Sequence, residues 1–266
     1  MKIIVCVKQV PDTSGKVAVN PDGTLNRASM AAITNPDDLN AVEAALTLKE
    51  ETGAEVVVVC MGPPPAEGML RECLARGCDR AVLVSGREFG GSDTYATSQI
   101  LAAAINKIGV EDDDIVLCGR QAIDGDTAQV GPQIGEKLHL PQISYAADIQ
   151  LDGNVVTVKR MLEDGYMTVK TQTPCLITCI KELNEPRYMS VYGIFDCYSK
   201  PYEVLDYNAL KDDPLIDPST IGLMGSPTNI LTSFTPPQKG AGMMLEGADK
   251  ATCDQLAGML AAKHMI

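Results

Sequence analysis

The first half of the chain alternates short, continuously apolar runs with segments of helical periodicity. The apolar runs lie at residues 2–7, 56–59, 81–84 and 115–118, without the polar–apolar alternation of a strand that has one wet face. Strands that are buried on both faces and separated by helices are typical of a parallel sheet covered by helices on both sides. We therefore predict an α/β fold with a Rossmann-like parallel sheet.

The helices between these strands are predicted from their spacing and from their end signals. The first begins at residues 35–38, Asn-Pro-Asp-Asp. Asparagine suits the cap, proline suits the first turn, and two acids suit the positive helix end. Gly53 is expected to end this helix, and Gly77 and Gly109 are expected to end two further helices. Helices of this length fit the connections of a parallel sheet, which should be right-handed.

The pattern changes near residue 142. The tripeptide Asp-Gly-Asn at residues 152–154 separates two strand-like runs, which predicts a β-hairpin. Further short strands are expected near residues 166–170 and 175–180.

The last part of the chain has little periodicity. Residues 186–245 are rich in Pro, Gly, Asp, Tyr and Ser, and a final helix is expected over roughly residues 247–264. A long segment without periodicity usually has a function or a partner. We therefore expect the α/β domain to occupy residues 1–190; the resemblance given below implies that it is a nucleotide-binding domain. A partner-docking loop and an extended C-terminal arm with its terminal helix are expected at residues 191–266.

Composition narrows the classes of function. The formal net charge of −13 argues against nucleic acid as a partner, because phosphate binding needs a basic surface. No apolar run reaches transmembrane length, and the first one is too short for a secretory signal, so a cytoplasmic protein without membrane insertion is expected. The nine cysteines contain no CxxC pair, and His139 and His264 are far apart, which argues against a zinc site or a His-based triad.

Candidate ligand-binding residues follow the carboxyl ends of the strands, where open α/β sheets bind their ligands. The most informative segment is residues 119–131, whose free amides suit a phosphate at a helix start. Asp124 and Asp126 are candidates for ribose hydroxyls, or they simply cap and turn the chain. Pro132 leaves two possibilities: the helix is kinked there, or it begins there after a loop. The absence of G-x-G-x-x-G after the first strand argues against an ordinary dinucleotide-dependent dehydrogenase.

Three motifs occur in the order and spacing of one known family. Residues 120–131, Arg-Gln-Ala-Ile-Asp-Gly-Asp-Thr-Ala-Gln-Val-Gly, resemble the nucleotide loop of electron transfer flavoprotein beta subunits. Residues 158–169, followed by 174–178, are similar to the family signature, with Met167 where Glu or Gln is usual. Residues 184–188, Asn-Glu-Pro-Arg-Tyr, resemble the start of the segment that docks onto partner dehydrogenases. The resemblance extends from the N-terminus to about residue 190.

The resemblance implies an adenine-nucleotide hydrolase-like fold with an adenine nucleotide at the strand ends. Carried over by position, the cofactor contacts fall on Cys6, Asn35, Pro36, Asp37, Asp38, Met61, Arg120, Gln121, Ala122, Ile123, Asp124, Gly125, Asp126, Thr127, Ala128, Gln129, Val130 and Gly131. The residue types alone support the helix start and the loop. Taken alone, Cys6 and Met61 indicate core positions.

The sequence of this loop also indicates which type of electron transfer flavoprotein the chain resembles. Asp-Gly-Asp-Thr-Ala-Gln-Val-Gly-Pro resembles the electron-bifurcating type of anaerobes, and the small Ala128 leaves room for FAD in place of a structural AMP. This type would take hydride from NADH and send one electron to ferredoxin or flavodoxin. The second electron of the pair would pass through the alpha-subunit FAD to an acyl-CoA dehydrogenase, an enoyl-CoA reductase or a lactate dehydrogenase.

NADH would need a site beside that flavin. We expect it at the loop that supplies Gly90, Gly91, Asp93 and Thr94, because its glycines permit close approach and it opens a helix. The competing interpretation is a plain connecting loop. For the whole chain, two other functions stay open: a non-bifurcating carrier subunit with structural AMP, and an ATP-using enzyme of the related fold. The second would want a phosphate loop at residues 9–14, which match one poorly.

Overall fold

The computed structural model describes residues 1–12, 32–229, 231 and 240–266. The described residues up to Leu231 belong to one compact unit, and residues 240–266 belong to a second. Each unit is considered separately.

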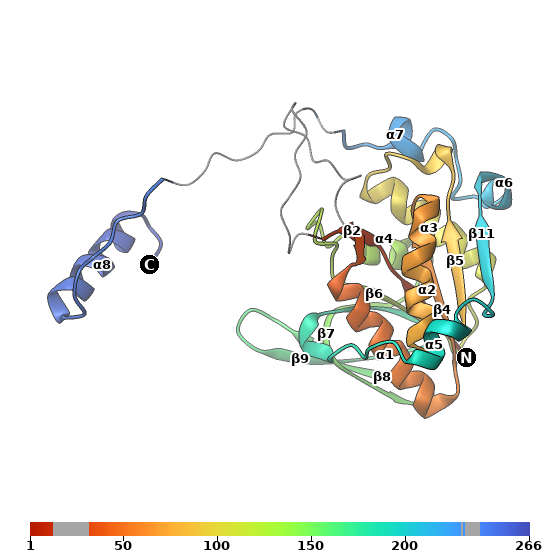
Figure 1. The fold of residues 1–266 in the computed structure, drawn as a ribbon, viewed down its shortest axis with the longest axis horizontal. Helices are drawn as coiled ribbons and strands as arrows, with labels where there is room; N and C mark the ends of the chain where they lie inside the picture. The colour runs from red at the N-terminus through yellow and green to blue at the C-terminus, as the bar shows by residue number, and fades with distance from the viewer. Residues whose placement is uncertain (13–31, 230, 232–239) are drawn as a thin grey trace. The chain divides into compact units, whose positions relative to one another are not determined.

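A nine-stranded sheet runs through the first unit in the order β11-β5-β4-β1-β6-β10-β7-β8-β9 (Figure 1). Its parallel strands are β1 (Lys2–Cys6), β4 (Glu55–Met61), β5 (Arg80–Val84), β6 (Ile115–Gly119), β10 (Cys175–Cys179) and β11 (Tyr202–Leu205). β1 pairs with β4 on one side and with β6 on the other, so the strand order reverses there. The predicted parallel sheet is confirmed, and its switch point is the gap beyond the carboxyl ends of β1 and β6.

The predicted hairpin is confirmed as well. β7 (Gln142–Asp152) pairs parallel with β10 and antiparallel with β8 (Val155–Met161), which pairs in turn with β9 (Tyr166–Gln172). The outer strands expose side chains on their faces, whereas every residue of β10 is buried.

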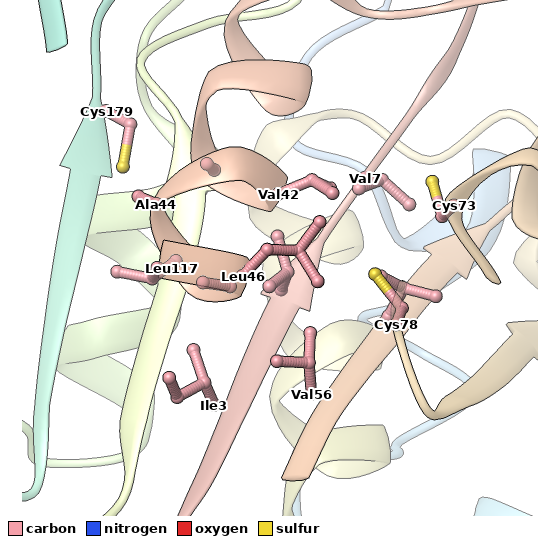
Figure 2. Close-up of a cluster of buried hydrophobic side chains, with 14 of the residues drawn as sticks. Ile3, Val7, Val42, Ala44, Leu46, Val56, Cys73, Cys78, Leu117 and Cys179 are labelled. Atoms are coloured by element: carbon pink, nitrogen blue, oxygen red, sulfur yellow. The ribbon is translucent and has the colours of Figure 1, made fainter. Parts of the chain in front are cut away.

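Helices cover both faces of the sheet. They are α1 (Pro36–Thr52) and α2 (Glu67–Arg76) on one face, and α3 (Thr94–Ile108) and α4 (Val130–Lys137) on the other. Successive residues of β1 alternate between the two cores, with Ile3 in the first and Ile4 in the second. Figure 2 shows Val42 and Leu46 of α1 above the strands in the first core. This two-sided burial explains why the strand sequences lack alternation.

The remaining elements complete both units. They are β2 (Gln9–Pro11), β3 (Ala32–Thr34), α5 (Val191–Asp196), α6 (Tyr207–Leu210), α7 (Gly222–Gly225), α8 (Lys250–Ala262) and the 3-10 turns Pro64–Ala66, Arg87–Phe89 and Lys181–Leu183. β2 and β3 form a separate antiparallel pair. Of these elements, α8 lies in the second unit, where Asp249 caps it. No helix among the described residues is long and apolar enough to cross a membrane.

The first unit extends past the boundary that the sequence predicts after residue 190. β11 adds a parallel strand beside β5, and Leu205, Leu210, Ile216 and Ile221 are buried in the second core. Single apolar residues without periodicity anchor this stretch, which is why its pattern predicts no core. Residues 232–239 of the predicted arm lie outside the described residues.

Candidate functional site

Asp38 joins the strand ends at the switch point. It lies in the first turn of α1 and is only 6% exposed. Its carboxylate accepts hydrogen bonds from the backbone N–H of Lys8 (2.8 Å) and of Gly119 (3.1 Å). Burial raises its pKa to about 7, against the opposing effect of the hydrogen bonds from Asn35, Lys8 and Gly119. A Cβ on Gly119 would lie 2.3 Å from Asp38 Oδ1, so the chain needs glycine there.

Asn35 holds the nucleotide loop, which we define as residues 120–131. The sequence predicts that its side chain caps α1, and this is wrong: Asn35 occupies the cap position but makes no side-chain cap. Its Nδ2 donates to the Gln121 carbonyl (2.8 Å), and its Oδ1 accepts from the Ile123 N–H (3.1 Å). Asn35 is fully buried, so these two bonds satisfy backbone groups that water does not reach.

Two ion pairs add to this attachment. Lys8 Nζ lies 2.7 Å from Asp124 Oδ1, and Arg120 Nε lies 3.3 Å from Asp37 Oδ2. Burial raises the pKa of Asp37, and the Arg120 charge opposes that shift. Four of the first five loop residues are therefore tied to Lys8, Asn35 and Asp37, between the end of β1 and the first turn of α1.

The end of the nucleotide loop presents free backbone amides. Asp126 and Ala128 both have φ 52°, in the left-handed region, and Gln129 returns to a right-handed conformation. A left-handed residue followed by a right-handed one turns successive N–H groups toward one side, which forms an anion-binding concavity. Within the described part of the chain, the amides of Thr127, Ala128 and Gln129 have no acceptor. This concavity opens at the start of α4, whose unpaired amides add to it.

The structure narrows two alternatives that the sequence left open in this loop. Asp126 does not cap a helix; its Oδ1 accepts from Gln121 Nε2 at 2.9 Å. α4 begins at Val130 and accommodates Pro132 in its first turn, where a missing N–H costs no helical bond, so the residues before it form a loop.

Close packing fixes the helix start above the strands. A Cβ on Gly131 would lie 2.6 Å from Cys118 Sγ and 2.9 Å from Thr178 Cγ2. Cys6 pairs with Cys118 in the sheet and lies in the second core, with Met61 packed against the same core. Burial raises the pKa of the Cys6 thiol to about 12. Cys6 and Met61 are thus the last residues of β1 and β4; Cys6 is a core residue, and Met61 is partly buried against that core.

The second candidate loop adjoins the first. The Thr94 hydroxyl donates to Gln129 Oε1 at 3.1 Å, which joins it to the nucleotide loop. Asp93 caps α3 by accepting from the Ala96 N–H (3.0 Å). The structure therefore brings the two predicted loops together.

A segment that the sequence did not single out covers the glycines of the second loop. The Leu223 N–H donates to the Gly90 carbonyl at 3.0 Å, and a Cβ on Gly91 would lie 2.8 Å from Leu223 Cβ. Ser226 accepts a hydrogen bond from the Asp93 N–H. The glycines thus have a packing role of their own. At the start of α3, the amides of Thr94 and Tyr95 remain without an acceptor among the described residues.

Comparison with known proteins identifies the family. Residues 22–204, more than half of the chain, match the electron transfer flavoprotein domain. The electron transfer flavoprotein subunit beta of Clostridium acetobutylicum is 48% identical over the whole of both chains. The chain belongs to the electron transfer flavoprotein family, as a beta-type subunit.

Two further relatives are components of reductase complexes. The acryloyl-CoA reductase electron transfer subunit gamma of Anaerotignum propionicum is 67% identical over the whole of both chains. The caffeyl-CoA reductase–Etf complex subunit CarD of Acetobacterium woodii is 51% identical over 99% of this chain and 97% of its own. The resemblance that the motifs indicated is confirmed.

This beta-type subunit also carries an exposed apolar surface, which we define as Tyr188, Val191, Tyr192, Phe195 and Tyr198. Tyr188 is 94% exposed and Phe195 is 78% exposed. The sequence marked only the beginning of this surface, through the motif at residues 184–188; the outward direction of α5 follows from its packing on α2.

Proposed function

We propose that this chain is the beta subunit of an electron-bifurcating electron transfer flavoprotein and that its nucleotide loop binds FAD. The observation that carries the proposal is the concavity of unpaired amides at Thr127, Ala128 and Gln129, at the switch point of the sheet. Amides so arranged suit a diphosphate. The flavin supplies hydride acceptance and one-electron release, whereas the protein supplies position and electrostatics.

Each group of residues has a distinct task in this proposal. The amides at the start of α4 hold the diphosphate. Asn35 holds the loop through its hydrogen bonds to Gln121 and Ile123, and Asp38 holds Gly119, the residue from which the loop leaves β6. Asp124 and Asp126 stay candidates for the ribose hydroxyls; Asp126 is exposed, whereas Asp124 pairs with Lys8.

We place NADH at the second loop. Hydride transfer needs the two reacting atoms within about 3–3.5 Å, so the two nucleotides must share one cleft. The Thr94–Gln129 hydrogen bond supports this placement, because it makes the two loops neighbours. The amides of Thr94 and Tyr95 at the start of α3 would bind the diphosphate of NADH.

The partners follow from the family and from the relatives. The alpha subunit supplies the second FAD, and ferredoxin or flavodoxin takes the low-potential electron. Two relatives named for acryloyl-CoA and caffeyl-CoA reductases favour an enoyl-CoA reductase as the high-potential acceptor, over an acyl-CoA dehydrogenase or a lactate dehydrogenase. We place that acceptor at the apolar surface, because exposed aromatic patches usually mark a protein interface.

The second unit is the proposed attachment to the alpha subunit. α8 buries none of its residues, and Leu256, Met265 and Ile266 are exposed. Deleting residues 240–266 should therefore weaken formation of the heterodimer, measured by titration with the alpha subunit. This cut spares β11 and the core residues up to Ile221. Unchanged affinity of the shortened chain would contradict the proposed attachment.

The experiment that tests the cofactor is a count of nucleotides. The heterodimer is purified without oxygen, the nucleotides are released by heat and they are separated by chromatography. FAD in excess of the alpha subunit's share is expected. AMP equimolar with this chain, with one FAD per heterodimer, would establish the alternative carrier function. The ATP-using alternative would need a phosphate loop at residues 9–14, of which residues 13 and 14 lie outside the described residues.

The mechanism has its own measurement. The anaerobic complex, with acryloyl-CoA reductase as the acceptor, should reduce ferredoxin from NADH only while that acceptor is being reduced. Ferredoxin reduction that proceeds equally well without the acceptor would contradict bifurcation.

A further inference from the structure

Polar groups of the first unit hold the backbone of the segment that carries the apolar surface. Its side chains point outward, and three tyrosines, a valine and a phenylalanine are largely exposed. Exposed apolar side chains do not themselves order a segment, because burial is what drives apolar groups together. The order comes from the contacts of its backbone and of its inward-facing side chains, because Cys197 is buried in the first core and Met189 packs against that core.

Arg187 attaches the beginning of the surface to α1. Its Nε and Nη2 donate to both carboxylate oxygens of Glu43, at 2.9–3.1 Å, and its Nη1 donates to Glu50. The Arg187 backbone N–H donates to the same Glu43 carboxylate at 3.0 Å. Glu43 therefore binds both the side chain and the main chain of one residue, which fixes the direction in which the chain continues to Tyr188.

Two neighbours reinforce this attachment. Asn40 Nδ2 donates to the Asn184 carbonyl (2.8 Å), and Asn184 Nδ2 donates back to the Asn40 carbonyl (2.9 Å). Arg76 Nη1 donates to the Arg187 carbonyl. Bidentate arginine–carboxylate pairs are directional and stronger than neutral hydrogen bonds. α1 thus carries the nucleotide loop at its N-terminus and the start of the apolar surface one to two turns later.

The far end of the surface is attached to α2. A Cβ on Gly193 would lie 2.1 Å from the Ala75 carbonyl oxygen, so only glycine lets α5 lie against α2. Arg71 Nη1 donates to the Cys197 carbonyl (2.9 Å), and its guanidinium lies 5.5 Å from the ring centre of Tyr198. The segment is therefore fixed at both ends.

We propose that Arg187, acting through Glu43, is a positioning residue that pre-forms the apolar surface for the flavoenzyme acceptor. This inference rests on the proposed docking of the acceptor at that surface. A surface that is ordered before binding loses less conformational entropy on association, which lowers the dissociation constant. A groove of about 550 Å³ between α2 and α5, lined by Pro65, Gly68, Met189 and Ile194, adjoins the surface and suits an apolar side chain of the acceptor.

The test uses the complete heterodimer and the variants Arg187→Lys and Glu43→Gln. Lysine keeps the charge but loses the bidentate geometry, and glutamine keeps one acceptor oxygen but loses the charge. The matched control is Arg80→Lys, which alters the Arg80–Glu55 ion pair at the amino ends of β4 and β5. Phe195→Ala removes an apolar side chain and leaves the contacts of Arg187 with Glu43 and Glu50, which we call the clamp, unchanged. Each protein is reduced with dithionite, and electron transfer to acryloyl-CoA reductase is measured.

We expect the clamp variants to change the KM for the acceptor and to leave kcat unchanged. Arg187→Lys should raise the KM for the acceptor about tenfold, with kcat and FAD content unchanged, because only encounter with the acceptor is affected. Amide hydrogen exchange over residues 188–198 should become faster in the same variant. Glu43→Gln should change both quantities in the same direction, and Arg80→Lys should change neither.

Three outcomes would overturn the proposal or its premise. If Phe195→Ala raises the KM but both clamp variants leave it unchanged, the docking stands and the positioning role fails. If exchange becomes faster while no variant, Phe195→Ala included, alters the KM, the acceptor docks elsewhere and the premise fails. A loss of kcat and FAD content in both clamp variants would assign Arg187 and Glu43 a general structural role instead.

Discussion

The nucleotide loop and the apolar surface are both attached to α1, but by contacts of different burial. Asn35 and Asp38, which hold the loop, are almost completely buried. In the contacts beneath the apolar surface, Glu43 is mostly buried, but Arg187 is one-third exposed and Glu50 is exposed. A buried polar group that loses its partner costs about 1–3 kcal/mol, whereas an exposed ion pair contributes about 0–1 kcal/mol. Damage to the loop attachment should therefore unfold the strand ends, and damage to the clamp should change only local order.

The largest effect is expected at the strand end beside Asp38. Gly119→Ala would place a Cβ 2.3 Å from Asp38 Oδ1 and 2.7 Å from the Asp38 nitrogen, and the backbone there cannot move away cheaply. We expect a loss of about 3 kcal/mol or more, the upper part of the range for overpacking. Urea unfolding measures it. Gly125→Ala is the matched control, because nothing lies within 4 Å of its Cβ position. Equal stability of the two variants would contradict the packing described here.

The next effect is expected from Asn35→Ala. It leaves the Gln121 carbonyl and the Ile123 N–H without their buried partner, at about 1–3 kcal/mol each. The nucleotide loop should become disordered, and the FAD released per heterodimer should fall below that of the wild type. Asn106→Ala removes an exposed hydrogen bond to Asp213 and serves as the control. Full FAD content in Asn35→Ala would show that the loop does not need this attachment.

The burial of Asp38 should make the stability of the fold depend on pH. The pKa of Asp38 is raised by burial to about 7 from 3.8, so the folded state holds a proton that the unfolded state has lost between these values. Stability then falls as pH rises from about 4 to about 7, by up to about 4 kcal/mol. Asp38→Asn lacks this dependence. The wild type should lose stability relative to the variant across this window in chemical unfolding, and a constant difference would contradict a raised pKa.

The smallest effect is expected where the two loops meet. Thr94→Val removes the exposed hydrogen bond to Gln129, worth about 0.5–1.5 kcal/mol. The KM for NADH should rise a few-fold with FAD content intact. Thr94→Val is a more selective test than a bulky residue at Gly91, because a side chain at Gly91 would clash with Leu223. Thr47→Val, which loses only a bond within α1, is the control. An unaltered KM for NADH would argue against a nicotinamide nucleotide beside Thr94.

The elements of the sheet were predictable because their signals are local. The apolar runs at residues 2–7 and 115–118 are β1 and β6, and the helix from Pro36 ends before Gly53, as its end signals predict. The hairpin at residues 152–154 follows from its turn residues. The family motif likewise singled out residues 120–131, which are consecutive, as the candidate nucleotide loop.

The contacts that the sequence missed join residues far apart in the chain. Asn35 is 86 residues from Gln121, and Arg187 is 144 residues from Glu43. Asparagine before a proline at a helix start predicts a cap, and only the arrival of the loop gives its amide a different partner. In the same way, Leu223 packs against Gly91, and no local sequence pattern predicts this contact.

By itself, the sequence determined the α/β class, the order of most strands and helices and the family, and it proposed residues 120–131 as the nucleotide loop. These follow from periodicity, turn chemistry and consecutive motifs, which depend on neighbours in the chain. The tertiary structure decided which side chains hold that loop, how far the compact unit continues past residue 190 and which way the apolar surface faces. Those features depend on which distant groups meet in the folded chain, and a buried polar group bonds whatever partner the fold brings within reach.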